Sequence, residues 1–323
     1  MQTNNTVAFA RVSANKDLRR IERIERLTPP LVLEALVDST VLEIMFNSDG
    51  LIYVERLGRL MQCIGTMDMN KLEALILAIA EYHKQTITAE NPVFSGTLPS
   101  NGARVEAIIP PAVESPVLCI RLKASSVFTL DDYVQNEIMM PKQKDIIVDA
   151  VRERKNILVV GSTGSGKTTL TNAIIAEIVR VKPEHRLIII EDTQEIQCAA
   201  ENRVILQATE TVSMLRLLKS TMRLRPDRIL VGEVRGPEAL ALLKAWNTGH
   251  PGGVATIHAN SAHAGLIRME QLIAEATETP MQRLIAEAVD LIIFIQKTET
   301  GRKVSEIVEV SAFTNNHYVT HHH

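Results

Sequence analysis

Short runs of apolar residues in the second half of the chain alternate with stretches of helical spacing. Each run is nearly free of charge, which is typical of parallel strands buried on both faces. The runs lie at Ile157–Val160, Leu187–Ile190, Ile229–Val231, Val254–Ile257 and Leu291–Ile295. Apolar residues at helical spacing mark Thr168–Lys182, Val212–Leu224 and Pro237–Trp246. This alternation predicts a mostly parallel sheet with helices on both faces.

The first part of the chain shows a different pattern. Residues 47–50, Asn-Ser-Asp-Gly, separate two strand-like runs and predict a hairpin turn. Strands are expected at Val41–Phe46, Leu51–Leu57, Arg104–Ile109 and Val117–Leu122, and helices at 14–27 and Asn70–His83. We therefore expect an N-terminal α+β domain over residues 1–123, a linker over 124–141 and an α/β domain over 142–323.

A glycine-rich turn lies between the first apolar run of the second domain and the helix that follows. It fits the pattern G-x-x-x-x-G-K-[ST], in which glycines let backbone N–H groups converge on a phosphate. Lys167 can reach the β- and γ-phosphates, and the Thr168 hydroxyl can bind Mg²⁺. The predicted nucleotide-binding residues are Gly161, Ser162, Thr163, Gly164, Ser165, Gly166, Lys167, Thr168 and Thr169.

The setting of this turn argues against an accidental match. Strand, loop and helix follow one another as the pattern requires, and the helix directs its positive N-terminal end at the loop. We therefore expect ATP and Mg²⁺ as ligands of this chain.

Polar residues follow other apolar runs, at the strand ends where open α/β sheets bind their ligands. Glu233 follows one such run, and we expect it to orient or activate the attacking water. Gly232 stands where such strands usually carry an aspartate. His258 also ends a strand, and we expect it near the γ-phosphate.

Because that aspartate is missing, Mg²⁺ needs oxygen ligands from elsewhere in the chain. Glu191 and Asp192 follow the apolar run that ends at residue 190, and carboxylate oxygens suit Mg²⁺. The predicted metal ligands are Thr168, Glu191 and Asp192, with Glu195 as a further supporting carboxylate.

Composition narrows the classes of function. The 323 residues, 46% hydrophobic and 23% charged, are typical of two globular domains. A net charge of −3 and 3% aromatic residues argue against direct sequence-specific binding of nucleic acid. Cys63, Cys119 and Cys198 are far apart and predict neither a disulfide framework nor a zinc site. Without a membrane-length apolar stretch or a signal-like segment in residues 1–20, we expect a cytoplasmic protein.

Four blocks in this order resemble the secretion ATPase family. They are the phosphate loop in NILVVGSTGSGKTT, the acidic box EDTQE, the glutamate-bearing motif ILVGE and the histidine box GHPGGVATIHA. The blocks EIMFNSDGLIYVERLG and NGARVEAIIPP resemble the conjugative-transfer members of its type IV secretion branch. The tetracysteine zinc module of many type II secretion and pilus-extension relatives cannot be built from this sequence.

The resemblance implies a C-terminal RecA-like P-loop NTPase domain, with nucleotide between it and the smaller N-terminal domain. It implies a homo-hexamer that hydrolyses ATP beside other secretion components, at the cytoplasmic face of the bacterial inner membrane. It also implies that Arg104 and Arg121 approach the phosphates and stabilise the transition state. The alternative is that both arginines are surface residues of strands and have no role at the phosphates.

Three other functions remain open. A retraction-type pilus motor also lacks the zinc module. A nucleotide-gated assembly scaffold with incidental hydrolysis needs neither Glu233 nor the acidic box. A small-molecule kinase needs a basic lid, and none is evident after the phosphate loop; Arg223 and Arg225 fit an inter-subunit or phosphate contact instead.

Two terminal segments need separate interpretation. Residues 11–26 carry a surplus of positive charge, and a basic amphipathic helix can lie as a peripheral element on anionic lipid. Packing of this helix on its own domain or on a neighbouring subunit is the alternative. His321–His323 resemble part of a purification tag and carry no functional prediction.

Overall fold

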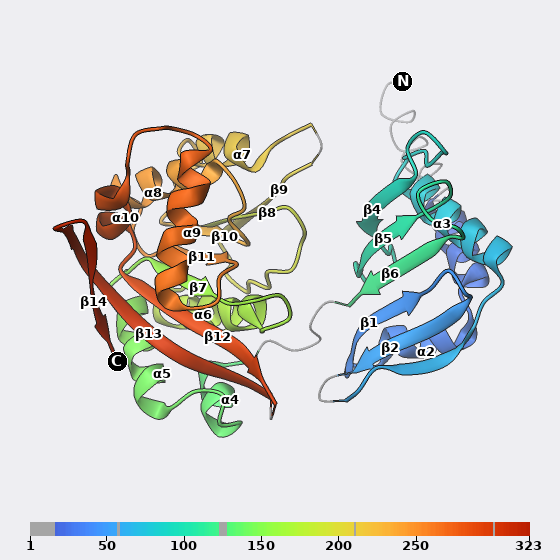
Figure 1. The fold of residues 1–323 in the computed structure, drawn as a ribbon, viewed down its shortest axis with the longest axis horizontal. Coiled ribbons are helices and arrows are strands. Elements are labelled where there is room, and N and C mark those ends of the chain that lie inside the picture. Colours follow the sequence, from blue (N-terminus) through green and yellow to red (C-terminus); the bar gives the residue numbers. More distant parts are fainter. Residues whose placement is uncertain (1–16, 57–58, 123–127, 210, 300) are drawn as a thin grey trace, which may run out of the picture. The chain divides into compact units, whose positions relative to one another are not determined.

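A computed structural model describes residues 17–56, 59–122, 128–209, 211–299 and 301–323 (Figure 1). The chain divides into two compact units, one ending at Ser125 and the other beginning at Ser126. Within the described residues, no helix is long and apolar enough to cross a membrane.

The N-terminal unit is built on a six-stranded antiparallel sheet of order β3-β2-β1-β6-β5-β4. The strands are β1 (Val41–Phe46), β2 (Leu51–Arg56), β3 (Gln62–Thr66), β4 (Val93–Thr97), β5 (Arg104–Ile108) and β6 (Val117–Arg121). The helices are a segment at 17–27, α2 (Pro30–Val37) and α3 (Met69–Tyr82). The pairing of β1 with β2 confirms the predicted hairpin.

The C-terminal unit contains an eight-stranded sheet of order β14-β13-β12-β7-β11-β10-β8-β9. Its strands are β7 (Ile157–Val160), β8 (Leu187–Glu191), β9 (Arg203–Gln207), β10 (Arg228–Val231), β11 (Val254–Ile257), β12 (Leu291–Thr298), β13 (Gly301–Thr314) and β14 (His317–His322). The strands from β12 to β9 are parallel, which confirms the predicted parallel sheet. The last two strands add an antiparallel extension that the apolar runs did not reveal.

Helices cover both faces of this sheet (Figure 1). They are α4 (Leu130–Gln135), α5 (Pro141–Arg152), α6 (Lys167–Val181), α7 (Met214–Thr221), α8 (Glu238–Asn247), α9 (Ala262–Ala274) and α10 (Gln282–Ala288). Alternate side chains of β7 enter different cores: Leu158 packs with α8, α9 and α10, whereas Val159 packs with α4, α5 and α6. Burial on both faces explains why these strands are uniformly apolar.

Part of the segment predicted as a linker, 124–141, is folded into the C-terminal unit. Residues 123–127 lie outside the described residues, but α4 begins at Leu130 and is capped by Thr129. Leu130, Tyr133 and Met139 are buried in the core beside α5 and α6. The sequence offered no long helical period here because α4 is too short to display one.

The C-terminal histidines belong to the sheet. His321 and His322 lie in β14, opposite Glu309 and Val308 of β13, and the His323 backbone N–H donates to Ile307 O at 3.0 Å. Their exclusion from the sequence interpretation therefore left out an edge strand. An edge strand with one solvated face gives only a weak alternating pattern, which explains why this strand was missed.

A tight contact fixes the loop that leads into β11. The indole N–H of Trp246 donates to Ile229 O in β10 at 3.2 Å. A Cβ atom on Gly253 would lie 2.0 Å from that indole nitrogen and 2.5 Å from the same carbonyl oxygen. Only glycine fits here, and the contact sets the start of the strand that ends next to His258.

Substitution of Gly253 by alanine should destabilise the C-terminal unit. Overpacking of this kind costs about 1–3 kcal/mol, because the added methyl group meets backbone and a packed ring. The single tryptophan, Trp246, makes fluorescence during urea unfolding a direct report on this unit. Lys244→Ala, on the exposed side of α8, is the control and should change the free energy of unfolding by under about 0.5 kcal/mol. Equal midpoints for both variants would contradict the assigned contact.

Candidate nucleotide site

The predicted phosphate loop connects β7 to α6 and has the backbone that anion binding requires. Gly164 and Gly166 adopt left-handed conformations, with φ of 71° and 96°. A Cβ on Gly161 would lie 2.3 Å from Ile295 O of β12, so the loop starts in close contact with the neighbouring strand. Ser162, Thr163 and Gly164 are exposed at the tip, where a phosphate can approach.

Lys167, the first residue of α6, has its ammonium group folded into the loop. Its Nζ donates to Gly161 O and Ser162 O at 2.9 Å each, and it lies 3.1 Å from His258 Nδ1. An ammonium group only donates, so Nδ1 accepts and the ring proton lies on Nε2. That nitrogen is 3.0 Å from Glu233 Oε1, to which it donates. His258 therefore bridges the phosphate-loop lysine and the predicted water-orienting glutamate.

The contacts continue beyond Glu233. Arg235 Nη2 donates to Glu233 Oε2 at 2.7 Å, and its Nη1 donates to Asp192 Oδ2 at 2.5 Å. We call the resulting series, Lys167–His258–Glu233–Arg235–Asp192, the polar chain. Arg235 is a member that sequence reasoning missed, although it lies two residues after Glu233.

The sheet topology explains why residues far apart in sequence meet in the polar chain. The strands β7, β11, β10 and β8 are consecutive neighbours and parallel, so their carboxyl ends share one edge. Lys167, His258, Glu233 and Asp192 each lie beyond one of these ends. This is the edge at which open α/β sheets bind ligands.

Opposing influences act on the Glu233 carboxyl group. Burial raises its pKa, but the hydrogen bond from Arg235, the positive charges of Arg235 and Lys167 and the neighbouring His258 ring together outweigh burial. The net result is a pKa below the usual value of a glutamate. Glu233 is therefore a carboxylate at neutral pH, the form that accepts a proton or a hydrogen bond from water.

The predicted metal ligands have unequal roles. Thr168 Oγ1 donates to Glu195 Oε2 at 3.1 Å, which brings two hard oxygen atoms together at the start of α6. Glu191 is 1% exposed, and its Oε2 accepts the backbone N–H groups of Glu195 and Ile196 at 2.9 and 3.0 Å. Among the described residues, no group of three or more His, Cys, Asp or Glu side chains could hold a metal ion.

These donors fit a magnesium ion of the kind found with nucleotides. Mg²⁺ keeps several water molecules and takes one or two protein oxygens together with phosphate oxygens, so a cage of carboxylates is not required. The Thr168 hydroxyl and the Glu195 carboxylate supply such oxygens.

The glycine at the expected aspartate position has a steric explanation. A Cβ on Gly232 would lie 3.0 Å from the Cβ of Glu191 on the neighbouring strand. Because Glu191 occupies this space, the acidic side chain at this point of the edge comes from β8 and not from β10.

Arg302 is a second residue that the sequence did not reveal. It lies in β13, and its Nε donates to Gly164 O at 3.3 Å. Its Cδ would be 2.9 Å from a Cβ on Gly166, so the missing side chain of Gly166 makes room for the arginine. The antiparallel extension thus places an additional cation against the phosphate loop.

Arg104 and Arg121 lie in the N-terminal unit, directly opposite each other on β5 and β6. Arg121 Nε is 3.8 Å from Glu43 Oε1 on the next strand, β1. Both arginines lie at strand ends of one sheet. Their approach to the phosphates stays a prediction.

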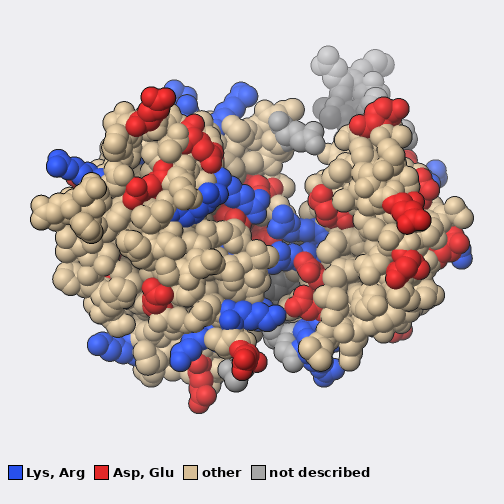
Figure 2. All heavy atoms as spheres, in the orientation of Figure 1, with Lys and Arg blue, Asp and Glu red and all other residues tan. Residues whose placement is uncertain are grey.

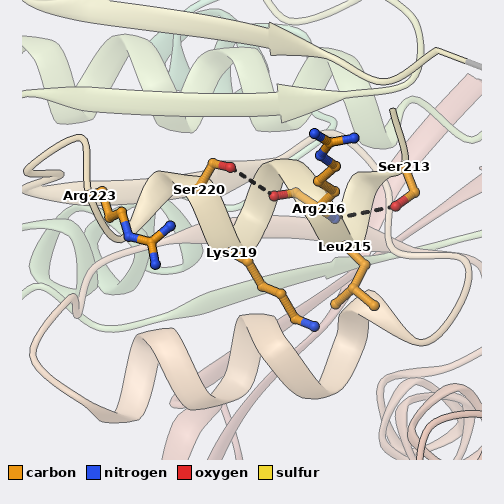
Figure 3. A pocket seen from close by; sticks show the side chains of 6 residues that line it. All are labelled: Ser213, Leu215, Arg216, Lys219, Ser220 and Arg223. Atoms are coloured by element: carbon orange, nitrogen blue, oxygen red, sulfur yellow. Dashed lines mark hydrogen bonds between the residues drawn. The ribbon is translucent and has the colours of Figure 1, made fainter. Parts of the chain in front are cut away.

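A basic hollow of about 540 Å³ lies along α7 (Figure 3). Its lining residues are Ser213, Leu215, Arg216, Lys219, Ser220 and Arg223. None of them belongs to the predicted nucleotide site. Figure 2 shows that both positive and negative side chains lie on the face in view.

Comparisons with known proteins identify the family of this chain. The family model of the type II/IV secretion system protein matches residues 29–317. Conjugal transfer protein TrbB of Rhizobium radiobacter is 53% identical over 289 residues, which cover 90% of this chain and 90% of that protein. Type IV secretion system protein VirB11 of Bartonella henselae is 33% identical over 288 residues, covering 75% of this chain and 80% of that protein.

Solved structures share the fold. The ATPase DotB of Yersinia pseudotuberculosis has a TM-score of 0.64 at 18% identity, covering 88% of this chain and 78% of that one. The pilus retraction motor PilT has a TM-score of 0.59 at 20% identity, covering 84% and 79%. Both likenesses concern the fold alone. The match to the family model and the identity to TrbB show that this chain belongs to the type II/IV secretion system protein family.

Proposed function

We propose that this chain hydrolyses ATP to ADP and phosphate and that it drives a type IV secretion or conjugative-transfer system. The main observation behind this proposal is that His258 contacts both Lys167 of the phosphate loop and Glu233. This contact supports the proposal because it joins the residue expected to bind phosphate to the residue expected to direct water. Relatives that cover most of the chain are named for conjugal transfer and type IV secretion.

The loop and α6 would bind the nucleotide in the first step. Backbone N–H groups of the loop and the N-terminal end of α6 favour negative charge. Lys167 Nζ now donates to two loop carbonyl groups, and it would exchange these contacts for phosphate oxygens. Hydrogen bonds to a charged phosphate are stronger than those to a carbonyl, which favours the exchange.

Hydrolysis then requires a directed water molecule. The water oxygen attacks the γ-phosphorus, the bond from phosphorus to the bridging oxygen breaks, and ADP leaves. The Glu233 carboxylate orients this water and accepts its proton. His258 contacts both Lys167 and Glu233, so it senses whether the phosphate end of the site is occupied.

Mg²⁺ would neutralise charge on the phosphate oxygens when bound. The Thr168 hydroxyl would hold it, with Glu195 beside it, and Asp192 would contact its waters. We assign Glu191 a supporting role, because its carboxylate already holds the backbone N–H groups of residues 195 and 196.

Assembly belongs to the same proposal. A homo-hexamer at the cytoplasmic face of the bacterial inner membrane, in contact with other secretion components, would let Arg104 and Arg121 reach bound phosphates. Two arginines side by side on β5 and β6 form a concentrated positive charge suited to this task. Hydrolysis would then be coupled to motion between the units.

Different observations bear on two alternative functions, a nucleotide-gated scaffold and a retraction-type motor. A nucleotide-gated scaffold has no use for a water-directing carboxylate, so the built contact between His258 and Glu233 favours hydrolysis. A retraction-type motor shares the fold, and the identity to conjugal transfer proteins favours the secretion branch.

Lys167→Ala should abolish productive nucleotide binding. The substitution removes the cation that faces the phosphates and the Nζ donor to the loop carbonyls of Gly161 and Ser162. Equilibrium binding of a fluorescent ATP analogue measures the loss. Lys182→Ala, at the C-cap of α6 and opposite the phosphate loop along the helix, is the control and should bind as the natural chain does. Unchanged affinity in Lys167→Ala would remove this lysine from the site.

Glu233→Gln should bind ATP normally but lower kcat by about 10²- to 10⁴-fold, the range for loss of a general base. The amide keeps the shape of the side chain and cannot accept a proton. Phosphate release, measured alongside nucleotide binding, separates these effects. The exposed Glu153→Gln serves as control. Substantial turnover by Glu233→Gln would exclude the assigned role.

A further inference from the structure

Arg235 is held at both ends by acidic groups from different elements. Its backbone N–H donates to Glu238 Oε1 at 2.8 Å, and the N–H of Gly236 donates to the same oxygen at 2.9 Å. Glu238 is 7% exposed in the first turn of α8. The backbone of Arg235 is therefore fixed before its side chain turns back over the edge of the sheet.

The guanidinium group then joins two carboxylates that follow neighbouring strands. Glu233 follows β10 and Asp192 follows β8, and each accepts from a different nitrogen of Arg235. The planar guanidinium has several N–H groups in a fixed fork, so it fixes both distance and orientation. A lysine ammonium has the charge but not the fork, and would hold one partner at a time.

We propose that Arg235 is the positioning residue that fixes the Glu233 carboxylate against His258 and ties it to Asp192. This inference rests on the proposed hydrolytic function of the site. With Oε2 held by Arg235 and Oε1 by His258, the carboxylate has one orientation before nucleotide arrives. Preorganisation of this kind matters because small misplacements of a catalytic group lower rates severely.

The charges around Glu233 support this assignment. Lys167 approaches from α6, His258 from the end of β11, Asp192 from the end of β8, and Arg235 from the same turn as Glu233. Burial raises the pKa of Glu233, and the largest opposing influence is the hydrogen bond from Arg235. Loss of Arg235 should therefore raise the pKa of Glu233.

The direction of the pH effect on activity follows because Glu233 acts in its ionised form. Activity falls as the pH drops through the pKa of Glu233, so a higher pKa moves this acid limb to higher pH. Arg235→Ala should show the shift and a kcat about 10- to 100-fold lower. The KM for Mg-ATP should change less than about twofold, because the guanidinium group of Arg235 binds Asp192 and Glu233 and not the phosphate loop.

Two further variants separate positioning from general damage. Arg235→Lys keeps a positive charge, so its acid limb should stay nearer that of the natural chain while kcat remains reduced. Arg152→Ala is the matched control: Arg152 is 57% exposed, Arg235 is 54% exposed, and each pairs with an aspartate. Arg152→Ala should leave kcat and the pH profile unchanged.

The deciding experiment is phosphate release against pH for the natural chain, Arg235→Ala, Arg235→Lys and Arg152→Ala. A shifted acid limb in Arg235→Ala, with near-normal behaviour of Arg152→Ala, supports positioning by Arg235. An unshifted limb with unchanged kcat, or a loss confined to KM, would overturn it. Absence of phosphate release from the natural chain would instead count against the proposed function, so the two failures are distinguishable.

Discussion

The bridge of His258 between Lys167 and Glu233 is the interaction that organises the whole site. One imidazole ring accepts from the phosphate-loop ammonium and donates to the carboxylate beyond β10. This is feasible only because β11 lies between β7 and β10 in the sheet, so that His258 emerges between its two partners. The strand order, the conformation of the phosphate loop and the Gly253 contact at the start of β11 together place His258 between Lys167 and Glu233.

The polar chain also shows how the site remains stable before nucleotide binds. Lys167 is buried, and its charge is compensated by carbonyl oxygens and by the imidazole. Asp192 and Glu233 would repel each other without Arg235 between them. Nucleotide must therefore compete with internal partners, and its binding energy is available to shift the conformational equilibrium of the protein. A motor requires this coupling of occupancy to structure.

The sequence predicted those parts of the fold and site that depend on local order. The residues of the phosphate loop are contiguous in the sequence. The strands β7, β10 and β11 are apolar because both of their faces are buried, so their ends could be located in the sequence. Glu233 and His258 could therefore be assigned to one edge of the sheet. Arg235 and Arg302 were assigned no role because they contact residues on other strands or loops. Glu195 was expected as a supporting carboxylate, but its contact with Thr168 could not be read from the sequence. The edge strand β14 and the short helix α4 were missed because partial exposure and short length weaken periodicity.

We expect this sheet edge to hydrolyse ATP within an assembly of subunits. The most direct measurement is phosphate release per subunit from Mg-ATP over a wide range of protein concentrations. We expect release of phosphate, with a specific activity that rises as subunits associate and Arg104 and Arg121 complete the sites. Binding of ATP without phosphate release at any concentration would contradict hydrolysis, and an activity independent of concentration would contradict sites completed by assembly.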